Sequence, residues 1–122
     1  MFARPGEDGT AMTDRGDTSD TTIGPLRMEN GEVLLHLAGE LDLSYVDMLW
    51  EAAAGALNAA PSRLVIDVSA VTFIDSSILG ALVRINRAAK EQGASFSLRQ
   101  PPRVVSRLLH LSGLEEEIEV EA

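Results

Sequence analysis

The sequence predicts one α/β domain, built on a mixed and mostly parallel sheet that begins with an antiparallel hairpin. The length of 122 residues suits a single domain, and the apolar share of 45% is enough to form its core. Two short apolar runs flank Glu29-Asn30-Gly31, and Asn-Gly between such runs is a strong hairpin signal. Beyond the hairpin, helical patterns alternate with short apolar runs, which is typical of parallel strands joined by helices.

Each element of this fold can be placed from its periodicity and its end signals. We expect the hairpin strands at residues 23–28 and 33–39, and a first helix from Ser44, a favourable N-cap, to about Asn58. Residues 64–66 form an unbroken apolar run, as in a strand buried on both faces. We then expect a helix from about Ser77 to Gln92 and a strand at 94–98. Pro101 and Pro102 open a third helix, whose apolar face consists of Val104, Val105, Leu108, Leu109 and Leu111. A last strand is expected at 118–120.

Composition and charge exclude several classes of function. The formal net charge of -9 argues against nucleic acid as a partner, because nucleic acid phosphates are bound by Lys and Arg. The chain has no cysteine, so disulfides, thiolate metal sites and cysteine nucleophiles are excluded. No apolar run approaches the roughly 20 residues of a membrane span, and we expect a cytoplasmic protein without membrane insertion. Residues 1–22, rich in Gly, Thr and Asp, are expected to form a disordered tail before a domain at 23–122.

The segment from Asp67 to Gly80 joins the central apolar run to the second long helix and is the most informative part of the chain. It places Asp75, Ser76 and Ser77 at a helix N-terminus, where backbone N–H groups lack partners and the helix dipole is positive. At about 100° per residue, one arc of this helix is apolar and the opposite arc faces solvent. The buried arc is expected to hold Ile78, Leu82, Ile85 and Ala89, and the exposed arc Ser76, Gly80, Val83, Arg84 and Arg87. Ser76 is thus expected at the solvent end of an exposed strip, whereas Ser77 lies nearer its edge.

Short motifs with a distinctive order and spacing run along most of the chain. These motifs are Leu37-Ala38-Gly39-Glu40-Leu41-Asp42, Asp67-Val68-Ser69, Phe73-Ile74-Asp75-Ser76-Ser77, Leu79-Gly80 and Leu111-Ser112-Gly113-Leu114. With them the chain resembles the STAS family over residues 23 to about 120, and specifically its single-domain bacterial anti-sigma factor antagonists. One position departs from the family pattern, because Gly usually follows the two serines and this chain has Ile78 there, on the predicted core side.

The resemblance implies a STAS fold, with helices packed mainly on one side of the sheet, and a regulatory function. In the family, the serine directly after the Asp is phosphorylated by a partner that is both serine kinase and anti-sigma factor, and the corresponding residue here is Ser76. The unphosphorylated antagonist captures the anti-sigma factor and so frees the sigma factor for transcription, whereas phosphorylation releases the complex. The resemblance and the helix projection together give the expected partner-binding residues as Asp42, Asp75, Ser77, Gly80, Val83, Arg84 and Arg87.

Three other interpretations of the same residues stay open at this point. Ser76 by itself would be an ordinary helix N-cap, worth about 1 kcal/mol. The domain would also suit a STAS interaction module that is never phosphorylated, such as a subunit of a lipid-transport ABC complex. The third is an enzyme using Asp42 and Asp75, but the sequence has no Gly-rich phosphate loop, metal-spaced histidines or nucleophile elbow. We therefore expect no catalytic residue, cofactor or metal, and we expect Trp50 to pack partly on the surface.

Overall fold

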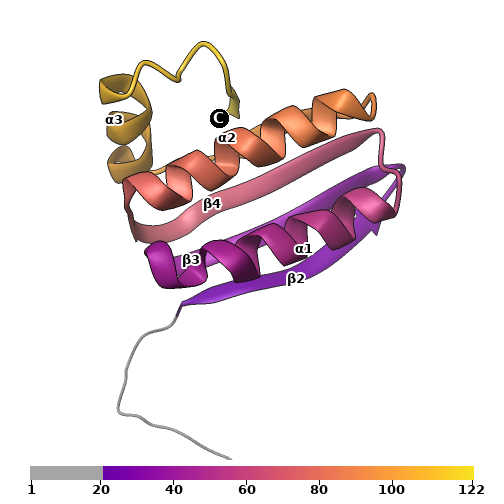
Figure 1. The fold of residues 1–122 in the computed structure, drawn as a ribbon, viewed down its shortest axis with the longest axis horizontal. Helices are drawn as coiled ribbons and strands as arrows, with labels where there is room; N and C mark the ends of the chain where they lie inside the picture. Colours follow the sequence, from indigo (N-terminus) through magenta and orange to yellow (C-terminus); the bar gives the residue numbers. More distant parts are fainter. Residues whose placement is uncertain (1–20) are drawn as a thin grey trace, which may run out of the picture.

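The computed structural model describes residues 21–122, which form one five-stranded sheet and three α-helices (Figure 1). The elements are β2 (Thr22–Glu29), β3 (Glu32–Leu41), the short 3-10 turn η2 (Leu43–Tyr45), α1 (Val46–Asn58), β4 (Arg63–Ile74), α2 (Ser76–Glu91), β5 (Ser95–Arg99), α3 (Arg103–Leu111) and β6 (Glu119–Glu121). The first 20 residues of the expected tail lie outside the described part, and β2 begins at Thr22. Within residues 21–122, none of the α-helices has the combination of length and apolar composition that a membrane span requires.

The sheet follows the order of the chain, β2-β3-β4-β5-β6, with β2 and β3 antiparallel and the other neighbours parallel. Figure 1 shows α1 and α2 side by side across one face of the sheet, with α3 at the end where α2 begins. Buried helix residues such as Leu49, Leu82 and Leu109 share one apolar core with strand residues such as Leu35 and Ile66. The expected α/β fold, mostly parallel after an antiparallel hairpin and with helices on one side, is confirmed.

The turn between β2 and β3 is the one that Asn30-Gly31 predicts. Both residues have positive φ, 54° for Asn30 and 80° for Gly31. Two successive positive φ angles are typical of a type I′ turn, which matches the twist of the paired strands and favours Asn-Gly. Glu29 and Glu32 lie opposite each other directly beside the turn. The two turn residues therefore set the register of the hairpin.

β4 is much longer than the apolar run that predicted it. It spans Arg63–Ile74, twelve residues, whereas the sequence indicated only 64–66. Its second half continues along β3 as far as Ile74, which pairs with Leu41. In the last six residues of β4 only Val71 and Ile74 are buried, so neither an unbroken apolar run nor a strict alternation marks this half as a strand.

The first helical segment begins at a different cap from the one predicted. Instead of Ser44, the residue that caps the turn η2 is Asp42, whose side chain accepts hydrogen bonds from the Ser44 amide (2.9 Å) and the Ser44 hydroxyl (2.6 Å). α1 then begins at Val46, after Tyr45, which makes no side-chain capping bond. Asp42 is thereby held in a tight turn directly after β3.

The sheet face that the helices leave open carries a network of charged side chains. Glu121 in β6 accepts hydrogen bonds from the Ser97 hydroxyl (2.7 Å), from Arg99 Nε (3.0 Å) and from Arg63 Nη2. Glu32 adds ion pairs to Arg63 at 3.4 Å and to Arg99 at 3.6 Å. The two arginines and the serine alternate with core residues along β4 and β5, so they project from the open face. The network ties the short last strand to the middle of the sheet.

Replacing Glu121 by glutamine is expected to destabilise the domain near neutral pH and to have little effect in acid. The pKa of Glu121 is lowered from 4.5 to about 2, mainly by the hydrogen bond from Ser97. Partial burial acts in the opposite direction, and the hydrogen bonds from Arg99 and Arg63 lower the pKa further. A carboxyl with a depressed folded-state pKa stabilises the fold above its unfolded pKa, and this stability is lost as the pH falls through the folded pKa. We expect Glu121→Gln to lower the free energy of unfolding by about 1–3 kcal/mol near neutral pH.

Chemical denaturation at a series of pH values measures this difference between wild type and variant. It is expected to shrink as the pH falls from about 4.5 toward about 2, the interval between the ordinary and the lowered pKa of Glu121. Glu119→Gln is the matched control. The Glu119 side chain is 60% exposed, and its carboxylate lies 3.9 Å from Arg63 Nη2, a longer ion pair than that of Glu121. Identical pH dependence in the two variants would contradict a stabilising role for the Glu121 network.

Candidate functional site

Two aspartates far apart in the sequence are brought to the same end of the sheet. Leu41 and Ile74, the last residues of β3 and β4, are paired, and Asp42 and Asp75 follow them directly. α2 begins with Ser76 at this end, and Figure 1 shows the start of α1 and the whole of α3 there as well. Because parallel strands end on the same edge, this is the usual position of functional loops in an α/β sheet.

Asp75 holds this end together as the N-cap of α2. Its Oδ1 accepts hydrogen bonds from the amides of Ser77 (3.0 Å) and Ile78 (3.1 Å) and from the Ser77 hydroxyl. Its Oδ2 accepts the amide of Leu43 at 3.2 Å, so one carboxylate connects α2 to η2. The pKa of Asp75 is lowered, mainly by the hydrogen bond from the Ser77 hydroxyl. Partial burial acts in the opposite direction, and the three backbone amides lower the pKa further. Asp75 therefore remains an ionised structural acceptor, and Ser76 is not the N-cap.

The two serines of this site are in different situations. The hydroxyl of Ser77 is half-buried and donates to Asp75. Ser76, at the first helical position of α2, is exposed, and its hydroxyl makes no hydrogen bond within residues 21–122. Modification of the Ser77 hydroxyl would remove its hydrogen bond to the capping residue Asp75, whereas modification of Ser76 would leave every hydrogen bond of Asp75 in place. The structure thus distinguishes two serines that are adjacent in the sequence.

The predicted exposed strip along α2 is confirmed for four of its five residues. Ser76, Gly80, Arg84 and Arg87 are all exposed and recur every three or four residues, so they share one side of the helix. A Cβ placed on Gly80 would meet no atom within 4 Å, so the space above the helix is open there. A partner can therefore approach the backbone of α2 closely beside Ser76.

The fifth residue of the predicted strip, Val83, is in the core. Its exposed fraction is 8%, so the expectation that it lies on the exposed arc of α2 is wrong. Asn86, three residues further on the same flank, is also buried, and its side-chain amide lies 3.4 Å from the carbonyl oxygen of Glu117. The loop between α3 and β6 covers this flank of α2. The helix projection considered α2 alone and did not include that loop.

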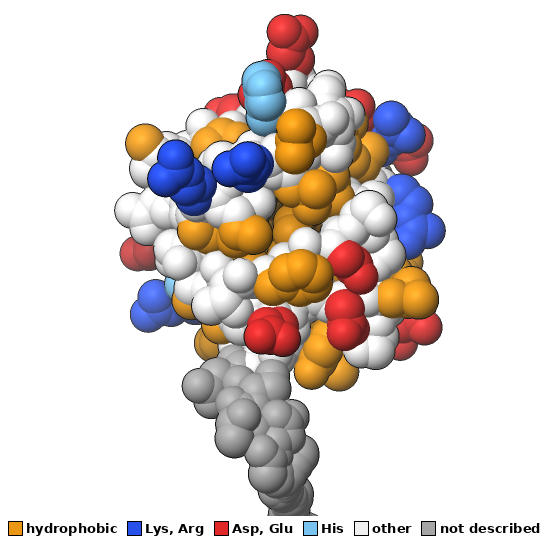
Figure 2. Space-filling view, turned by 90° about the vertical axis from the view of Figure 1, so that its left-hand side faces the viewer, with side chains coloured by type: hydrophobic (Ala, Val, Ile, Leu, Met, Phe, Trp, Pro, Cys, Tyr) orange, Lys and Arg blue, Asp and Glu red, His pale blue; other side chains and the backbone are white. Residues whose placement is uncertain are grey.

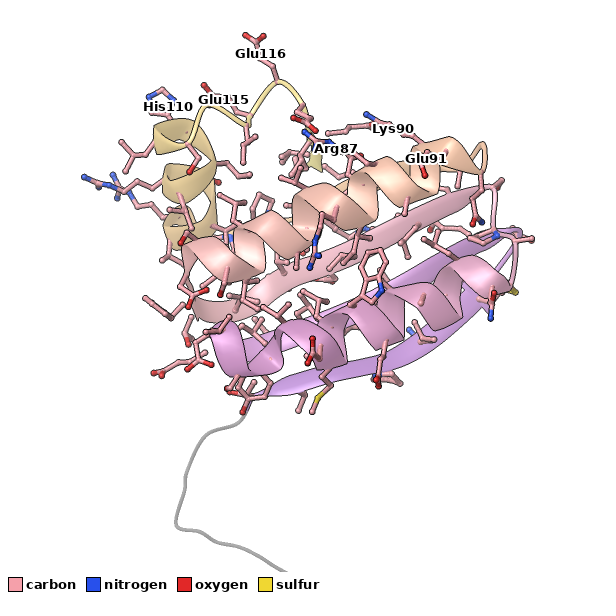
Figure 3. The ribbon with its side chains drawn as sticks, viewed as in Figure 1. Arg87, Lys90, Glu91, His110, Glu115 and Glu116 are labelled. Carbon is pink, nitrogen blue, oxygen red and sulfur yellow. The ribbon has the colours of Figure 1, made fainter. Side chains whose placement is uncertain are left out.

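Both arginines of the strip are already engaged in contacts with neighbouring elements. The guanidinium of Arg84 lies 5.6 Å from the ring centroid of Trp50 on α1, within the range of a cation–π contact. Trp50 is 38% exposed, as the sequence predicted for a partly packed side chain. Arg87 pairs with Glu117 at 3.1 Å, and Figure 3 shows it on the side of α2 that faces the α3–β6 loop. These contacts hold both guanidinium groups in place on the exposed side of α2.

The alternative of an acid/base pair concerns Asp42 and Asp75, and both of these carboxylates accept hydrogen bonds that cap a helical turn. Asp42 accepts two hydrogen bonds from Ser44, and Asp75 accepts bonds from its own helix start and from Leu43. Each carboxylate thus has a structural task. Within the described part of the chain, no three His, Asp or Glu side chains are grouped so that they could hold a metal ion.

Two exposed apolar residues beside this site were missed by the sequence analysis. Leu43 is 70% exposed directly after Asp42, and Phe73 is 46% exposed shortly before Asp75. Figure 2 faces this end of the molecule and shows apolar side chains across its middle, with basic side chains above them on the left and acidic ones below. The only available signal was their position next to the polar motifs, because apolar residues near strand ends are ordinarily assigned to the core.

Comparison with known proteins identifies the family. The family model described as "Mlab, STAS domain" matches residues 26–120, and the chain belongs to the STAS domain family. Among characterised proteins it is similar to the anti-sigma-F factor antagonist RsfB of Mycobacterium tuberculosis, with 34% identity over 87 residues, 71% of this chain and 70% of RsfB. The family predicted from the sequence motifs is confirmed.

Solved structures show the same fold. An anti-sigma factor antagonist from Mycobacterium paratuberculosis superimposes with a TM-score of 0.75 at 24% identity, covering 84% of this chain and 86% of that chain. The anti-sigma factor antagonist SpoIIAA in its unphosphorylated form gives a TM-score of 0.70 at 22% identity, covering 83% of this chain and 89% of SpoIIAA. At these identities the likeness concerns the architecture, and it agrees with the STAS fold described above.

Proposed function

We propose that this protein is an anti-sigma factor antagonist that is switched by phosphorylation of Ser76. In this proposal the unphosphorylated domain, residues 23–122, binds a cytoplasmic anti-sigma factor with serine kinase activity. The binding surface consists of Ser76, the exposed strip of α2 and the neighbouring end of the sheet with Asp42. Binding frees a sigma factor for transcription, and phosphorylation of Ser76 ends it. The observation that carries the proposal is the exposed hydroxyl of Ser76, which makes no hydrogen bond among residues 21–122, at a helix start that Asp75 caps independently.

The chemistry of this helix start suits a reversible phosphate. A phosphate adds about -1.5 to -2 charge at one point, and anions near a helix N-terminus are favoured by roughly 0.3–1 kcal/mol. The domain is therefore expected to stay folded, while a bound partner would meet both added bulk and added charge. Ile78, which stands where the family usually has glycine, is fully buried and adds nothing to the surface around Ser76. The relation to RsfB and to SpoIIAA supports the choice of partner class.

Intact mass spectrometry tests the modification. The protein is incubated with ATP and each anti-sigma kinase of the host in turn, as wild type, as Ser76→Ala and as Ser77→Ala. We expect one added phosphate in wild type and none in Ser76→Ala. Ser77→Ala, which removes a hydroxyl bound to Asp75 and keeps Ser76, is expected to accept the phosphate.

The remaining outcomes distinguish the alternatives. A phosphate that persists in Ser76→Ala and disappears in Ser77→Ala would show that Ser77, and not Ser76, is the phosphorylated residue. The absence of any phosphate, together with a stable complex with an anti-sigma factor, would leave a STAS binding module without this switch. The absence of both, together with co-purification of membrane ATPase subunits, would favour a role in a transport complex.

A further inference from the structure

α3 presents a second apolar stripe to solvent, in addition to the one that it buries. Val105 and Leu109, two residues of the predicted apolar face, belong to the core. Val104, Leu108 and Leu111 recur at the spacing i, i+4, i+7 on an adjacent side, where Val104 is 37% and Leu111 is 73% exposed and Leu108 is half-buried against the core. The sequence predicts one apolar face of five residues on this helix, and in the structure this face is divided, because Val104 and Leu111 are exposed. An apolar stripe of about two turns therefore remains accessible.

The charge of α3 is opposite to that of the protein as a whole. The chain has a net charge of -9, but the helix carries Arg103 and Arg107 and contains no acidic residue. Both arginines are exposed, and neither forms an ion pair within residues 21–122, in contrast to Arg63 and Arg87, for example. Among the same residues, α3 makes one contact with a charged side chain, at its end, where His110 Nδ1 lies 3.0 Å from Glu115 (Figure 3). Unpaired cations beside an exposed apolar stripe form a surface that is complementary to an acidic amphipathic segment.

We propose that the α3 surface, defined as Arg103, Val104, Arg107, Leu108 and Leu111, docks an acidic amphipathic helix of a partner protein. The apolar stripe would pack against the apolar side of that helix, and the two arginines would pair with flanking carboxylates. α3 stands at the end of the molecule where α2 begins, so one partner can reach both Ser76 and this surface (Figure 1). The inference rests on the proposed function only in taking the anti-sigma factor as the source of the helix. An anionic membrane is disfavoured as the occupant by the net charge of -9.

A synthetic peptide tests the docking surface without any anti-sigma factor. The probe is an amphipathic helical peptide with Leu at i, i+3, i+4 and i+7 and Glu at the flanking positions, titrated into the uniformly 15N-labelled full chain at low salt. We expect amide shift changes concentrated in α3, and weaker binding at high salt because exposed charges are screened. The same peptide with Lys in place of Glu is expected to bind at least tenfold more weakly. Shifts spread over other elements, or equal binding of the Lys peptide, would overturn the proposal.

Two variants and one control localise the contact. Arg107→Glu and Leu111→Ser are each expected to weaken peptide binding about tenfold or more, with the remaining amide spectrum unchanged as evidence of folding. Arg27→Glu makes the same charge reversal at an exposed residue of β2 and is expected to bind like wild type. Unchanged affinity in both α3 variants would refute the surface. Binding to vesicles of phosphatidylglycerol and phosphatidylcholine, without binding to the acidic peptide, would replace the protein partner by a membrane.

The outcome of this experiment is separate from that of the phosphorylation test. Ser76→Ala is expected to leave peptide binding unchanged, because Ser76 is not part of the α3 surface. Failure of the peptide to bind, combined with phosphate transfer to Ser76, would reject the α3 surface and keep the proposed function. Peptide binding without phosphate transfer to Ser76 would keep the α3 surface and reject the phosphorylation switch.

Discussion

Replacing Ser76 by aspartate is expected to lower the affinity for the anti-sigma factor about a hundredfold while the domain stays folded. Ser76 is exposed at the first position of α2, beside the open surface over Gly80, so an added charge faces the partner directly. A loss of about 3 kcal/mol in binding free energy corresponds to roughly this factor. The fold is expected to tolerate the charge because the helix dipole favours an anion at this position. Titration calorimetry with the kinase identified by mass spectrometry measures the affinity.

A second aspartate at a distant position is the control for charge alone. Ser95 is exposed at the start of β5, at the opposite end of the sheet, and Ser95→Asp makes the same chemical change there. We expect Ser95→Asp to bind the anti-sigma factor like wild type. Ser76→Ala is expected to bind it as well, and to stay bound when ATP is added, because it cannot be phosphorylated at residue 76. Equal losses in Ser76→Asp and Ser95→Asp would show that the net charge, and not the site, controls binding. Unfolding of Ser76→Asp would mean that the residue is needed for structure.

Replacing Asp75 by alanine is expected to destabilise the domain by about 2 kcal/mol, the upper part of the range for the loss of a helix cap. The carboxylate accepts hydrogen bonds from Ser77, Ile78 and Leu43, so its removal frees donors on two separate elements. Denaturant unfolding gives the change in stability. Hydrogen exchange adds the local information, because the amide of Leu43 is expected to lose protection together with those of Ser77 and Ile78.

Asp47→Ala is the matched control for this variant. Asp47 is an exposed aspartate in the first turn of α1 and caps no helix, so its removal is expected to cost only about 0.5 kcal/mol. Loss of protection at Ser77 and Ile78 with unchanged exchange at Leu43 would show that Asp75 is a helix cap and not a link to η2. A destabilisation no larger than that of Asp47→Ala would show that the hydrogen bonds of Asp75 do not stabilise the domain.

The sequence by itself determined those features that depend on local chemistry and periodicity. Asn30-Gly31 specified the hairpin turn, because few residues other than these adopt two successive positive φ angles. The spacing of apolar residues specified α2, with Ile78 and Leu82 in the core and Ser76 at the exposed start. The motifs around Asp42 and Asp75 specified the family. Each of these features can be recognised from residue types and their spacing along the chain, without knowledge of the packing partners.

Only the tertiary structure decided how separate segments cover or expose one another. Val83 is buried on the flank of α2 where Asn86 contacts the loop before β6, and Leu111 is exposed because no element within residues 21–122 covers its side of α3. Asp75 connects two helix starts because the adjacent ends of β3 and β4 bring Leu43 within 3.2 Å of its carboxylate. A periodic pattern records which residues share a face, but burial of that face depends on packing partners that are distant in the chain.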